Sequence, residues 1–432
     1  MSHSQLSTFN SQLIPAGYKQ TEVGIIPDEW EVCAVRQKGE VVTGKALAVN
    51  APGLQRPYLR TKNVFDGRID IGDVLTMPMT EEQFTQFQIR SGDVLLNEGQ
   101  SIDLVGRCAL YQNEYPEPCA IQNALLRFRA RPGVSEKFAS YLFRHCQHTG
   151  VFARIALQTT SVAHLGGSRF EKLRLAWPTE LEQHAIAEAL SDADALIESL
   201  EQLLAKKRQI KQGAMQELLS GKKRLPGFSG EWEVKRLGDE TDRITKGTTP
   251  TSLGRNFTDQ GINFVKVESL SEEGSVISEM LAAIDDNTHR LLKRSQLREK
   301  DILFSIAGAL GRTAIVKTDL LSANTNQALA IIRIKAQSCL RHDFLLKYLA
   351  GPQILAHITA INVQAAQANL SLEDIRSFEV PAPSPDEQIA IATVLSDMDA
   401  EIAALEAKLA KARLLKQGMM QELLTGRIRL IN

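Results

Sequence analysis

Residues that could carry out chemistry are sparse along this chain, and their spacing matches no catalytic motif that we recognise. The stretch GALGRT, which begins at Gly308, comes nearest to a phosphate-binding loop, but it lacks the lysine and the spacing that let backbone amides wrap a phosphate. HExxH and GxSxG motifs and a paired acidic and lysine nuclease set are absent from the sequence. The eight histidines are dispersed, and His184, His289 and His342 lie in polar contexts typical of surface residues. The sequence therefore favours binding over turnover.

Length, composition and charge limit the class of protein. The chain has 432 residues, of which 43% are hydrophobic and 23% charged, so its length predicts roughly two to four globular domains. A net charge of −1 is not the basic balance of a stand-alone nucleic-acid binder, although a balanced total can hide one basic face. No apolar run is long enough to cross a bilayer, and the N-terminus MSHSQLSTFN does not resemble a signal peptide. We therefore expect a cytoplasmic protein.

The five cysteines are scattered and form no closely spaced pair. This pattern predicts neither a zinc site nor a disulfide framework. We expect reduced thiols in the core at Cys33, Cys108, Cys119, Cys146 and Cys339.

The chain contains an internal repeat, which determines its organisation. KQGAMQELLSGKKRL begins at Lys211 and KQGMMQELLTGRIRL begins at Lys416, and the same shift aligns Glu182–Leu225 with Glu387–Leu430. The likeness continues upstream, where DEWEV echoes GEWEV around Trp30 and Trp232, and where a Gly-Arg pair recurs at Gly106-Arg107 and Gly311-Arg312. Each long, diverged segment is thus followed by a shorter, well-matched one.

The short segments are predicted to be helices. Apolar residues follow the a/d pattern of a coiled coil, with Leu190, Ala193, Ile197, Leu200 and Leu204 in the first copy and Leu395, Met398, Ile402, Leu405 and Leu409 in the second. Each helix could run for about 35 residues, or about 50 Å, before a glycine cap at Gly221 or Gly426. An isolated helix would leave its apolar stripe in water, so we expect the copies to pair antiparallel with the long segments at opposite ends of one rod.

The long segments are predicted to be mixed α/β domains. Short apolar or alternating runs, such as DVLLNE, ALLRFRA, DILFSI and LAIIRI, are separated by Gly, Asn and Asp as strands are. A helical stretch from Ser135 or from Asp343 precedes a last strand-like piece, KLRLAWP or SFEVPAP. For Trp30 and Trp232 we favour an apolar anchor at the start of each domain over a base-stacking role.

The junction segments resemble those of type I restriction-modification specificity subunits. The residues that carry the likeness begin with EQHAIAEALSDADALIESLEQLLAKKRQIKQGAMQELLSGKKRL at Glu182 and with EQIAIATVLSDMDAEIAALEAKLAKARLLKQGMMQELLTGRIRL at Glu387, together with the opening GYKQTEVGIIPDEWEV. The likeness spans almost the whole chain. It implies an α+β fold in which two mixed α/β target-recognition domains are separated by two long helices that pair as an antiparallel coiled coil, with pseudo-two-fold symmetry.

The resemblance also implies domain boundaries and a role. We expect an N-terminal extension (1–20), a first target-recognition domain (21–180), a helical spacer (181–225), a second recognition domain (226–385) and a second spacer (386–432). Each recognition domain would bind one half of a split, non-palindromic sequence in double-stranded DNA. The spacer would dock two methyltransferase subunits, and through them the restriction and translocase subunits, in the cytoplasm of a bacterium or archaeon and associated with the nucleoid.

Catalysis would belong to the partners in such a complex. The resemblance implies that S-adenosylmethionine is bound by the methyltransferase and that ATP and magnesium are bound by the restriction subunit, with no cofactor or metal in this chain. The complex would methylate adenine at N6 and cleave DNA with ATP. The asparagine-proline-proline-aromatic motif of amino-methyltransferases is accordingly absent here.

Base recognition in the major groove uses amide and guanidinium side chains on exposed loops. In the first domain the candidates are Arg60, Lys62, Asn63, Asn97, Gln100, Arg107, Gln122, Asn123 and His164, with Glu98 beside them. In the second they are Lys246, Thr248, Lys266, Arg312, Asn324, Asn326, Gln327 and Asn369. His164 and Asn369 end two polar loops at corresponding positions, 159–164 and 364–369. Any one of these residues could instead cap a turn or be solvated, and the shared Gly-Arg pairs suit common structure or phosphate contact better than base identity.

Polar residues of the repeated block suggest a surface for a partner. Packing explains its leucines but not why its polar residues recur, so we expect a docking face at Lys211, Gln212, Gln216 and Glu217 and at Lys416, Gln417, Gln421 and Glu422. The basic run from Lys206 to Arg224 could contact DNA or could be a solvated helix face. Two other functions stay open, namely a coiled-coil protein scaffold without DNA binding and an enzyme with an unfamiliar site.

Overall fold

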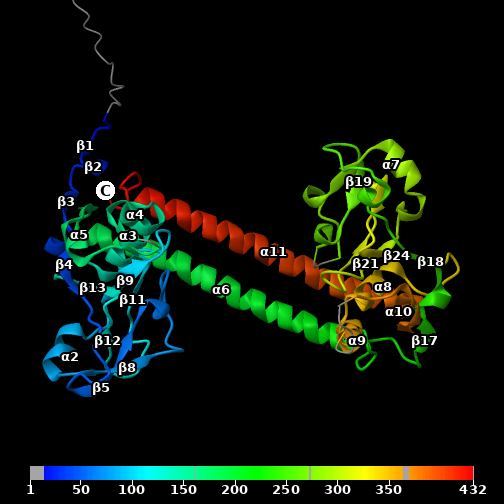
Figure 1. Cartoon of the computed structure of the whole chain (residues 1–432), viewed down its shortest axis with the longest axis horizontal. Coiled ribbons are helices and arrows are strands. Elements are labelled where there is room, and N and C mark those ends of the chain that lie inside the picture. Colours follow the sequence, from blue (N-terminus) through cyan, green and yellow to red (C-terminus); the bar gives the residue numbers. More distant parts are fainter. Residues whose placement is uncertain (1–13, 160, 272–273, 363–368, 432) are drawn as a thin grey trace, which may run out of the picture. The chain divides into compact units, whose positions relative to one another are not determined.

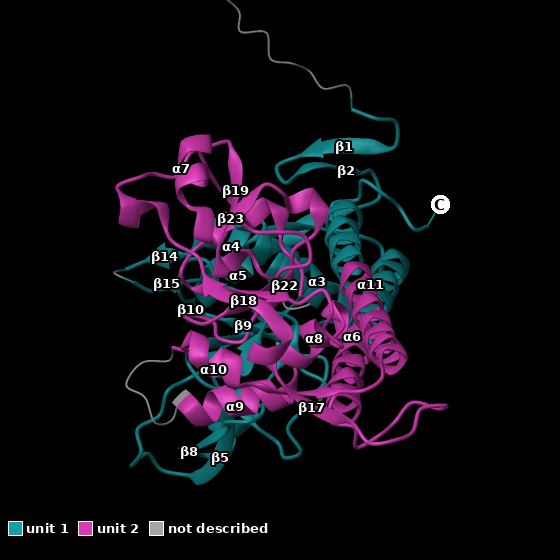
Figure 2. Cartoon of the chain, turned by 90° about the vertical axis from the view of Figure 1, so that its right-hand side faces the viewer, with its two compact units in different colours: residues 1–199, 409–432 teal, residues 200–408 magenta. Residues whose placement is uncertain are grey.

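The computed structural model describes residues 14–159, 161–271, 274–362 and 369–431 (Figure 1). The chain divides into two compact units, coloured separately in Figure 2. Unit 1 consists of Met1–Ser199 and Leu409–Asn432, and unit 2 consists of Leu200–Lys408. The two long helices, α6 (Glu180–Leu218) and α11 (Pro385–Leu423), therefore each contribute residues to both units.

The remaining elements of unit 1 precede α6. They are β1 (Tyr18–Thr21), β2 (Gly24–Pro27), β3 (Glu31–Ala34), α1 (Val35–Lys38), β4 (Gly39–Thr43), β5 (Leu54–Leu59), β6 (Val64–Phe65), β7 (Arg68–Ile69), β8 (Leu75–Met79), α2 (Glu81–Phe87), β9 (Val94–Asn97), β10 (Gly99–Gln100), β11 (Cys108–Leu110), β12 (Ala120–Ile121), β13 (Leu125–Ala130), α3 (Glu136–His148), α4 (Val151–Ile155), β14 (Leu157–Gln158), β15 (Ala163–His164), α5 (Gly167–Lys172) and β16 (Arg174–Trp177).

Unit 2 is built from a similar series of elements between α6 and α11. They are β17 (Glu233–Arg236), β18 (Thr241–Lys246), β19 (Ile262–Val265), β20 (Ala282–Ile284), α7 (Asp286–Leu291), β21 (Ile302–Ser305), β22 (Thr313–Ile315), β23 (Ala323–Thr325), β24 (Leu329–Ile334), α8 (His342–Leu349), α9 (Pro352–Asn362), α10 (Leu372–Ser377) and β25 (Glu379–Ala382).

The two main sheets of each unit have the same topology, and unit 1 contains β1-β2, β6-β7 and β10-β15-β14 in addition. A four-stranded sheet runs β11-β9-β13-β4 in unit 1 and β22-β21-β24-β18 in unit 2, and a three-stranded sheet runs β12-β5-β8 in unit 1 and β23-β19-β20 in unit 2. The first and last strands of each unit also pair, as β3 with β16 and as β17 with β25. The duplication that the sequence predicts is thus confirmed in strand order as well as in strand position.

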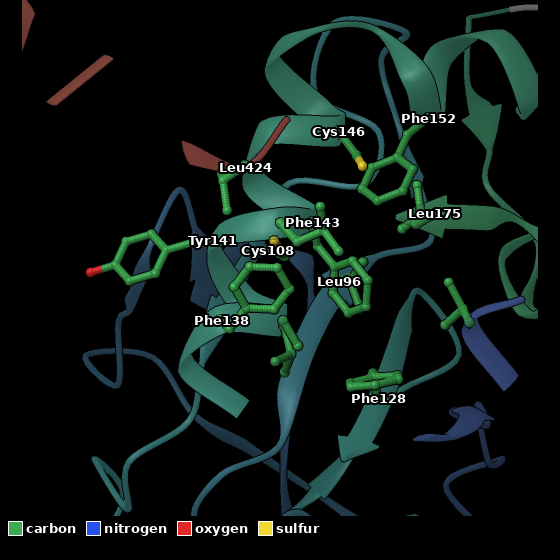
Figure 3. Close-up of a cluster of buried hydrophobic side chains, with 14 of the residues drawn as sticks. Leu96, Cys108, Phe128, Phe138, Tyr141, Phe143, Cys146, Phe152, Leu175 and Leu424 are labelled. Atoms are coloured by element: carbon green, nitrogen blue, oxygen red, sulfur yellow. The ribbon is translucent and has the colours of Figure 1, made fainter. Parts of the chain in front are cut away.

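The four-stranded sheet of unit 1 is buried on both faces, which explains its continuous apolar strands. Val94, Leu96 and Phe128 pack in one core cluster with α3, whereas Leu95 and Leu125 pack in another with β5 and β12. In the first cluster Phe128, Phe138, Phe143 and Phe152 surround Cys108 and Cys146 (Figure 3). Unit 2 repeats this alternation in β21 and β24.

The long helices pair antiparallel within each unit, as predicted. In unit 1, Asp194 on α6 pairs with Lys416 on α11, and Glu182 on α6 pairs with Arg429, which follows the end of α11, so partner numbers fall along one segment as they rise along the other. In unit 2 the same order holds for Lys211 with Asp399 and for Arg224 with Glu387. Of the predicted seam residues, Leu190, Leu200, Leu204, Leu395, Ile402 and Leu409 are buried, and Ala193, Ile197, Met398 and Leu405 are half-buried. The predicted caps adopt a left-handed conformation, with φ of +70° at Gly221 and +71° at Gly426.

Two smaller features of the fold concern the cysteines and the apolar helices. All five cysteines are free; Cys339 is half-buried and the other four are buried in the cores. Among the described residues, no single helix is long and apolar enough to cross a membrane, and α8 with α9 passes that test by length and composition only as a bent pair. Phe344, Leu345 and Ile354 of that pair are buried in the core of unit 2.

Candidate nucleic-acid interface and docking surface

Loops from several strands meet at one edge of unit 1. β4 ends with Thr43 beside Leu126 and β9 ends with Asn97 beside Leu125, so the loops that follow both strands flank the loop before β13. β12 and β5 run parallel, so the loops after these two strands leave in the same direction. β15 pairs with β10, which brings residues 163–164 to the same edge. We call these residues, 44–45, 60–62, 98–100, 122–124 and 163–164, recognition edge 1.

Unit 2 has an equivalent edge. Lys246 at the end of β18 lies beside Ala330, and Ser305 at the end of β21 lies beside Leu329. β19 and β23 run parallel, and Ala307 forms an isolated bridge with Asn369. Recognition edge 2 therefore consists of residues 246–249, 266, 306–308, 326–328 and 369.

A glycine lets the backbone segments of each edge approach closely. A Cβ at Gly44 would lie 2.1 Å from the carbonyl oxygen of Gln122, and one at Gly247 would lie 2.0 Å from that of Thr325. No other residue fits such a contact without a shift of the backbone. The two edges therefore keep the same framework while the side chains on it differ.

Most predicted DNA-binding residues lie on these edges with their side chains exposed or half-buried. They are Arg60, Lys62, Gln100, Gln122, Asn123 and His164 on edge 1, and Lys246, Thr248, Lys266, Asn326, Gln327 and Asn369 on edge 2. Loop residues 160 and 363–368, beside His164 and Asn369, lie outside the described residues.

Several of these side chains are held by neighbours on the edge. Arg60 and Lys62 both bond to Asp73, at 2.7 Å each, and the hydrogen bond from Lys62 lowers the pKa of that carboxyl group. Arg294 donates to Thr248 Oγ1 at 2.9 Å. Such contacts limit rotamer freedom before any ligand binds.

The structure contradicts the prediction for three amide residues. Asn63, Asn97 and Asn324 are at most 1% exposed, so they cannot reach a base edge without unfolding of the loop. Asn63 donates to the backbone carbonyls of Asp70 and Asp73, and Asn324 donates to that of Leu292. These three side chains fix the loops of the edges from inside.

The Gly-Arg pairs have a structural explanation. Gly106 and Gly311 have φ of +77° and +79°, and a Cβ there would lie 2.2 Å and 2.8 Å from the side chains of Phe152 and Leu355. Arg107 Nε donates to the carbonyl of Val64 at 3.1 Å, and its guanidinium lies 4.8 Å from the centre of the Phe65 ring. Burial lowers the pKa of Arg107. Arg312 is half-buried, and its guanidinium makes no hydrogen bond or ion pair with the described residues.

The repeated polar block divides into two sets. Gln212, Gln216 and Glu217 on α6 and Gln417 and Gln421 on α11 are exposed, and Glu422 is half-buried. Lys416, however, is only 9% exposed and is paired with Asp194, so its prediction as a docking residue is wrong. Its burial lowers its pKa, an effect that Asp194 opposes. Lys211 is half-buried and makes the equivalent pair with Asp399.

The exposed part of each block has apolar and small neighbours. Ile210 and Leu415 occupy equivalent positions and are 46% and 61% exposed. Gly213 and Gly418 follow them inside a helix, and a Cβ at either glycine would meet nothing within 4 Å. Glycine in a helix interior costs about 0.5–1 kcal/mol relative to alanine, and no contact within either unit accounts for it.

A cavity lies beside this block in each unit. The cavity of unit 1 has a volume of about 1460 Å³ and is lined by Lys416, Gln417 and Met420 together with the β1–β2 hairpin and the end of α3. The cavity of unit 2 has a volume of about 420 Å³ and is lined by the equivalent Lys211, Gln212 and Met215. The two blocks therefore have related but unequal surroundings.

Each unit also contains a buried cluster that the sequence did not reveal. Glu182 is fully buried and accepts hydrogen bonds from Trp30 Nε1 at 2.8 Å and from Arg429 Nη2 at 2.9 Å. Glu387 is 1% exposed and accepts from Trp232 Nε1 at 3.1 Å and from Arg224 Nη2 at 2.6 Å. We call these the Trp–Glu–Arg clusters; they confirm Trp30 and Trp232 as anchors of their units.

One basic residue of edge 1 and one that supports it were also missed. Lys45 is exposed directly after Gly44. The sequence feature that could have identified Lys45 is the glycine that precedes a polar residue in both units, Gly44 in unit 1 and Gly247 in unit 2. Arg169 is half-buried and donates to the carbonyls of His164 and Leu165. Among the described residues, no group of three or more His, Cys, Asp or Glu side chains could hold a metal ion.

Comparison with protein families identifies both halves of the chain. The model of the type I restriction modification DNA specificity domain matches twice, at residues 27–211 and 229–413. Two curated relatives illustrate the sequence likeness. The putative type I restriction enzyme MjaX specificity subunit of Methanocaldococcus jannaschii is 26% identical over 95% of this chain and 96% of its own length. The EcoBI specificity subunit of Escherichia coli is 25% identical over 72% of this chain and 69% of its own length.

Solved structures share the fold. The S subunit of a type I restriction-modification system from M. genitalium superposes with a TM-score of 0.54 and 16% identity, and covers 91% of this chain and 96% of its own. A chain from a study of complex assembly and conformational transition of the type I R-M system gives a TM-score of 0.58 and 17% identity, over 93% of this chain and 99% of its own.

Proposed function

This chain belongs to the family of type I restriction-modification DNA specificity proteins, and we propose that it selects a two-part DNA sequence, with one half-site bound at each recognition edge. The observation that carries this proposal is the pair of equivalent edges. Their frameworks are the same, down to Gly44 and Gly247, but their side chains differ. Two edges that share a backbone framework but carry different side chains are suited to bind two half-sites of different sequence.

Contacts to DNA would divide by chemistry. The exposed amides Asn123 and Gln327 and the half-buried Gln122 and Asn326 can pair with base edges in the major groove, where Asn and Gln suit adenine. Lys45, Lys62 and Lys246 would bind phosphates, which position a protein on DNA without specifying sequence. With a net charge of −1 on the whole chain, part of the phosphate contacts would come from partner subunits.

The exposed blocks on α6 and α11 would dock two methyltransferase subunits. Ile210 and Leu415 supply an apolar contact, and Gly213 and Gly418 let a partner helix come close to the backbone. Gln212, Gln216, Glu217, Gln417, Gln421 and Glu422 surround these positions. Because the blocks are equivalent, two copies of one partner could bind in the same way.

Under this proposal the chain is a recognition subunit of a cytoplasmic complex and carries no catalytic residues. S-adenosylmethionine would be held by the methyltransferase, and ATP and magnesium by the restriction subunit. The complex would methylate adenine and cleave DNA.

Methylome sequencing tests the main proposal. A methylation-deficient host that expresses this chain with its methyltransferase should acquire methylated adenines in one split motif. A catalytically inactive methyltransferase is the control. A scaffold that does not bind DNA, which is the alternative function, would leave no such motif, and the purified complex would show no sequence preference in binding assays.

Charge reversal tests the docking block. Glu217→Lys with Glu422→Lys should reduce co-purification of the methyltransferase, whereas Glu180→Lys, at an exposed position on the first turn of α6, should not. Unchanged co-purification of the double variant would argue against this docking face.

A further inference from the structure

His164 on recognition edge 1 is held by a set of contacts that unit 2 lacks. Its Nδ1 lies 3.0 Å from Glu98 Oε2, and the side chains of His164 and Glu98 are 44% and 15% exposed. The half-buried carboxylate therefore holds a ring that is itself open to solvent.

Gly99, Gly166 and Arg169 also help to position His164. A Cβ at Gly99 would lie 3.3 Å from both Cε1 and Nδ1 of His164, so the absent side chain lets the ring rest against the strand. Arg169 Nη2 donates to the carbonyl oxygen of His164 at 2.6 Å. Gly166, at φ +71°, makes room for that guanidinium, since a Cβ there would lie 2.6 Å from Arg169 Nη2.

The contact with Glu98 determines which ring atom is available. A carboxylate oxygen can only accept a hydrogen bond, so the shared hydrogen lies on His164 Nδ1. No other hydrogen bond of the ring is formed with the described residues, which leaves Nε2 without a partner. In the neutral ring Nε2 is then an acceptor.

The equivalent positions in unit 2 carry different chemistry. Asn369 bridges Ala307, and Ile306 stands where unit 1 has Glu98. An imidazole held by a carboxylate is therefore a feature of edge 1 and not of the shared framework. Because the backbone framework is shared and this side-chain pair is not, His164 and Glu98 are suited to determine how the sequence of one half-site differs from that of the other.

From this geometry, and given the proposed function, we infer that His164 Nε2 accepts a hydrogen bond from the exocyclic amino group of one base in the half-site of unit 1. In the major groove such groups are N6 of adenine and N4 of cytosine. Glu98 is a positioning residue that fixes the ring, and Arg169 fixes the backbone beside it. A ring held in place before binding loses little freedom on contact with DNA.

Removal of the amino group at one base tests the contact directly. Methylome sequencing of the wild-type complex first gives the half-site of unit 1 and every adenine or cytosine position in it. Duplexes are then made in which purine replaces one adenine, or 2-pyrimidinone replaces one cytosine, so that only the amino group is lost. At one position this should weaken wild-type binding about three- to tenfold, the worth of one hydrogen bond, and the responding base identifies adenine or cytosine.

The His164→Ala complex should bind that modified duplex as well as it binds the unmodified one. Its methylome should become degenerate at this position, with the half-site of unit 2 unchanged. The matched variant Asn369→Ala should leave the half-site of unit 1 unchanged. Glu98→Gln keeps an oxygen that accepts from Nδ1 and should keep the motif, whereas Glu98→Leu should relax it.

Other outcomes overturn the inference. If a folded His164→Ala complex keeps the wild-type motif, or if it stays as sensitive to loss of the amino group as the wild type, His164 does not contact that group. An equal loss of affinity for all sequences with a smaller salt dependence would assign His164 to a phosphate. If the wild-type complex yields no split motif at all, the proposed function fails, and that result is distinct from the failure of this contact.

Discussion

Glu182 and Glu387 show what a buried side chain does that a sequence does not reveal. Each stands in the first turn of a long helix, where an acidic residue suits the helix dipole and needs no further explanation. The structure instead buries both and surrounds each with an indole and a guanidinium. The hydrogen bond to Glu182 raises the pKa of Arg429. The sequence could predict the two tryptophan anchors but not their partners, because these come from far along the chain.

Removal of the buried carboxylate should destabilise unit 1. Glu182→Ala leaves the indole of Trp30 without its acceptor and leaves the guanidinium of Arg429 with Glu29 as its carboxylate partner, so we expect a loss of about 3 kcal/mol in the free energy of unfolding. Calorimetry should show a melting temperature lower by several degrees. Glu180→Ala, at an exposed position two residues earlier, should change it little. A Glu182→Ala chain as stable as the wild type would mean that the cluster contributes nothing.

Asp66 should make the stability of unit 1 sensitive to acid. Burial alone would raise its pKa, but hydrogen bonds from His148 and Arg144 outweigh burial and lower the pKa below the usual value of an aspartate. A lowered pKa in the folded state stabilises the protein above the unfolded pKa, and this contribution is lost as the pH falls through the folded value.

The variant Asp66→Asn should therefore be less stable than the wild type at neutral pH, and the difference should shrink as the pH falls below about 4. Thermal unfolding between pH 2 and pH 7 measures it. Asp103→Asn, at an exposed position of the same unit, is the control. A stability difference that does not change over this range would show that Asp66 is not held by these ion pairs.

The strands and helices could be predicted more fully than the loops. Short apolar runs placed β9, β13, β21 and β24 correctly, because a strand buried on both faces needs apolar residues on both. The roles of amide side chains in loops were harder to predict. Asn63 and Asn97 donate their side-chain N–H groups to backbone carbonyls within the fold, and contact with a base would need the same N–H groups. Within the basic run from Lys206 to Arg224, Lys207 and Arg208 pair with Glu401 and Glu406 of α11, a contact that neither interpretation of the run included.

Substitution of Gly213 and Gly418 tests the docking of a partner separately from the folding of the chain. Leucine at Gly213 or Gly418 should stabilise the free chain by about 0.5–1 kcal/mol, because leucine is a better helix former and a Cβ at either position meets nothing within 4 Å. It should also block the close approach of a partner helix. Each single variant should lose one methyltransferase copy and the double variant should lose both, as counted by native mass spectrometry.

Ala403→Leu, at an exposed position of α11, should leave the stoichiometry unchanged. If the double variant still bound two copies, the partner would not approach these glycines. If it bound none because it failed to fold, its melting temperature would fall, although we expect it to rise.

The sheets and the core of each unit support the loops of that same unit. The core of unit 2 combines Leu218 at the end of α6 and the following Leu219 with Ile391 and Leu395 of α11 and with the apolar faces of β21 and β24. These four residues lie outside the segment Thr241–Ser384, and so does the whole cluster of Arg224, Trp232 and Glu387. A related segment should therefore find its packing partners in place.

Exchange of Thr241–Ser384 for the equivalent segment of another family member should change the half-site of unit 2 alone. Edge 2 lies wholly inside that segment and edge 1 lies wholly outside it, so the side chains that face the first half-site stay the same. The methylome of the hybrid complex would show a new second half-site beside an unchanged first one. The reciprocal exchange of residues 39–177 is the matched control and should change only the first. If either exchange altered both half-sites in a folded hybrid, base recognition would not be divided between the two edges, and a single surface formed by both units would have to account for the sequence preference.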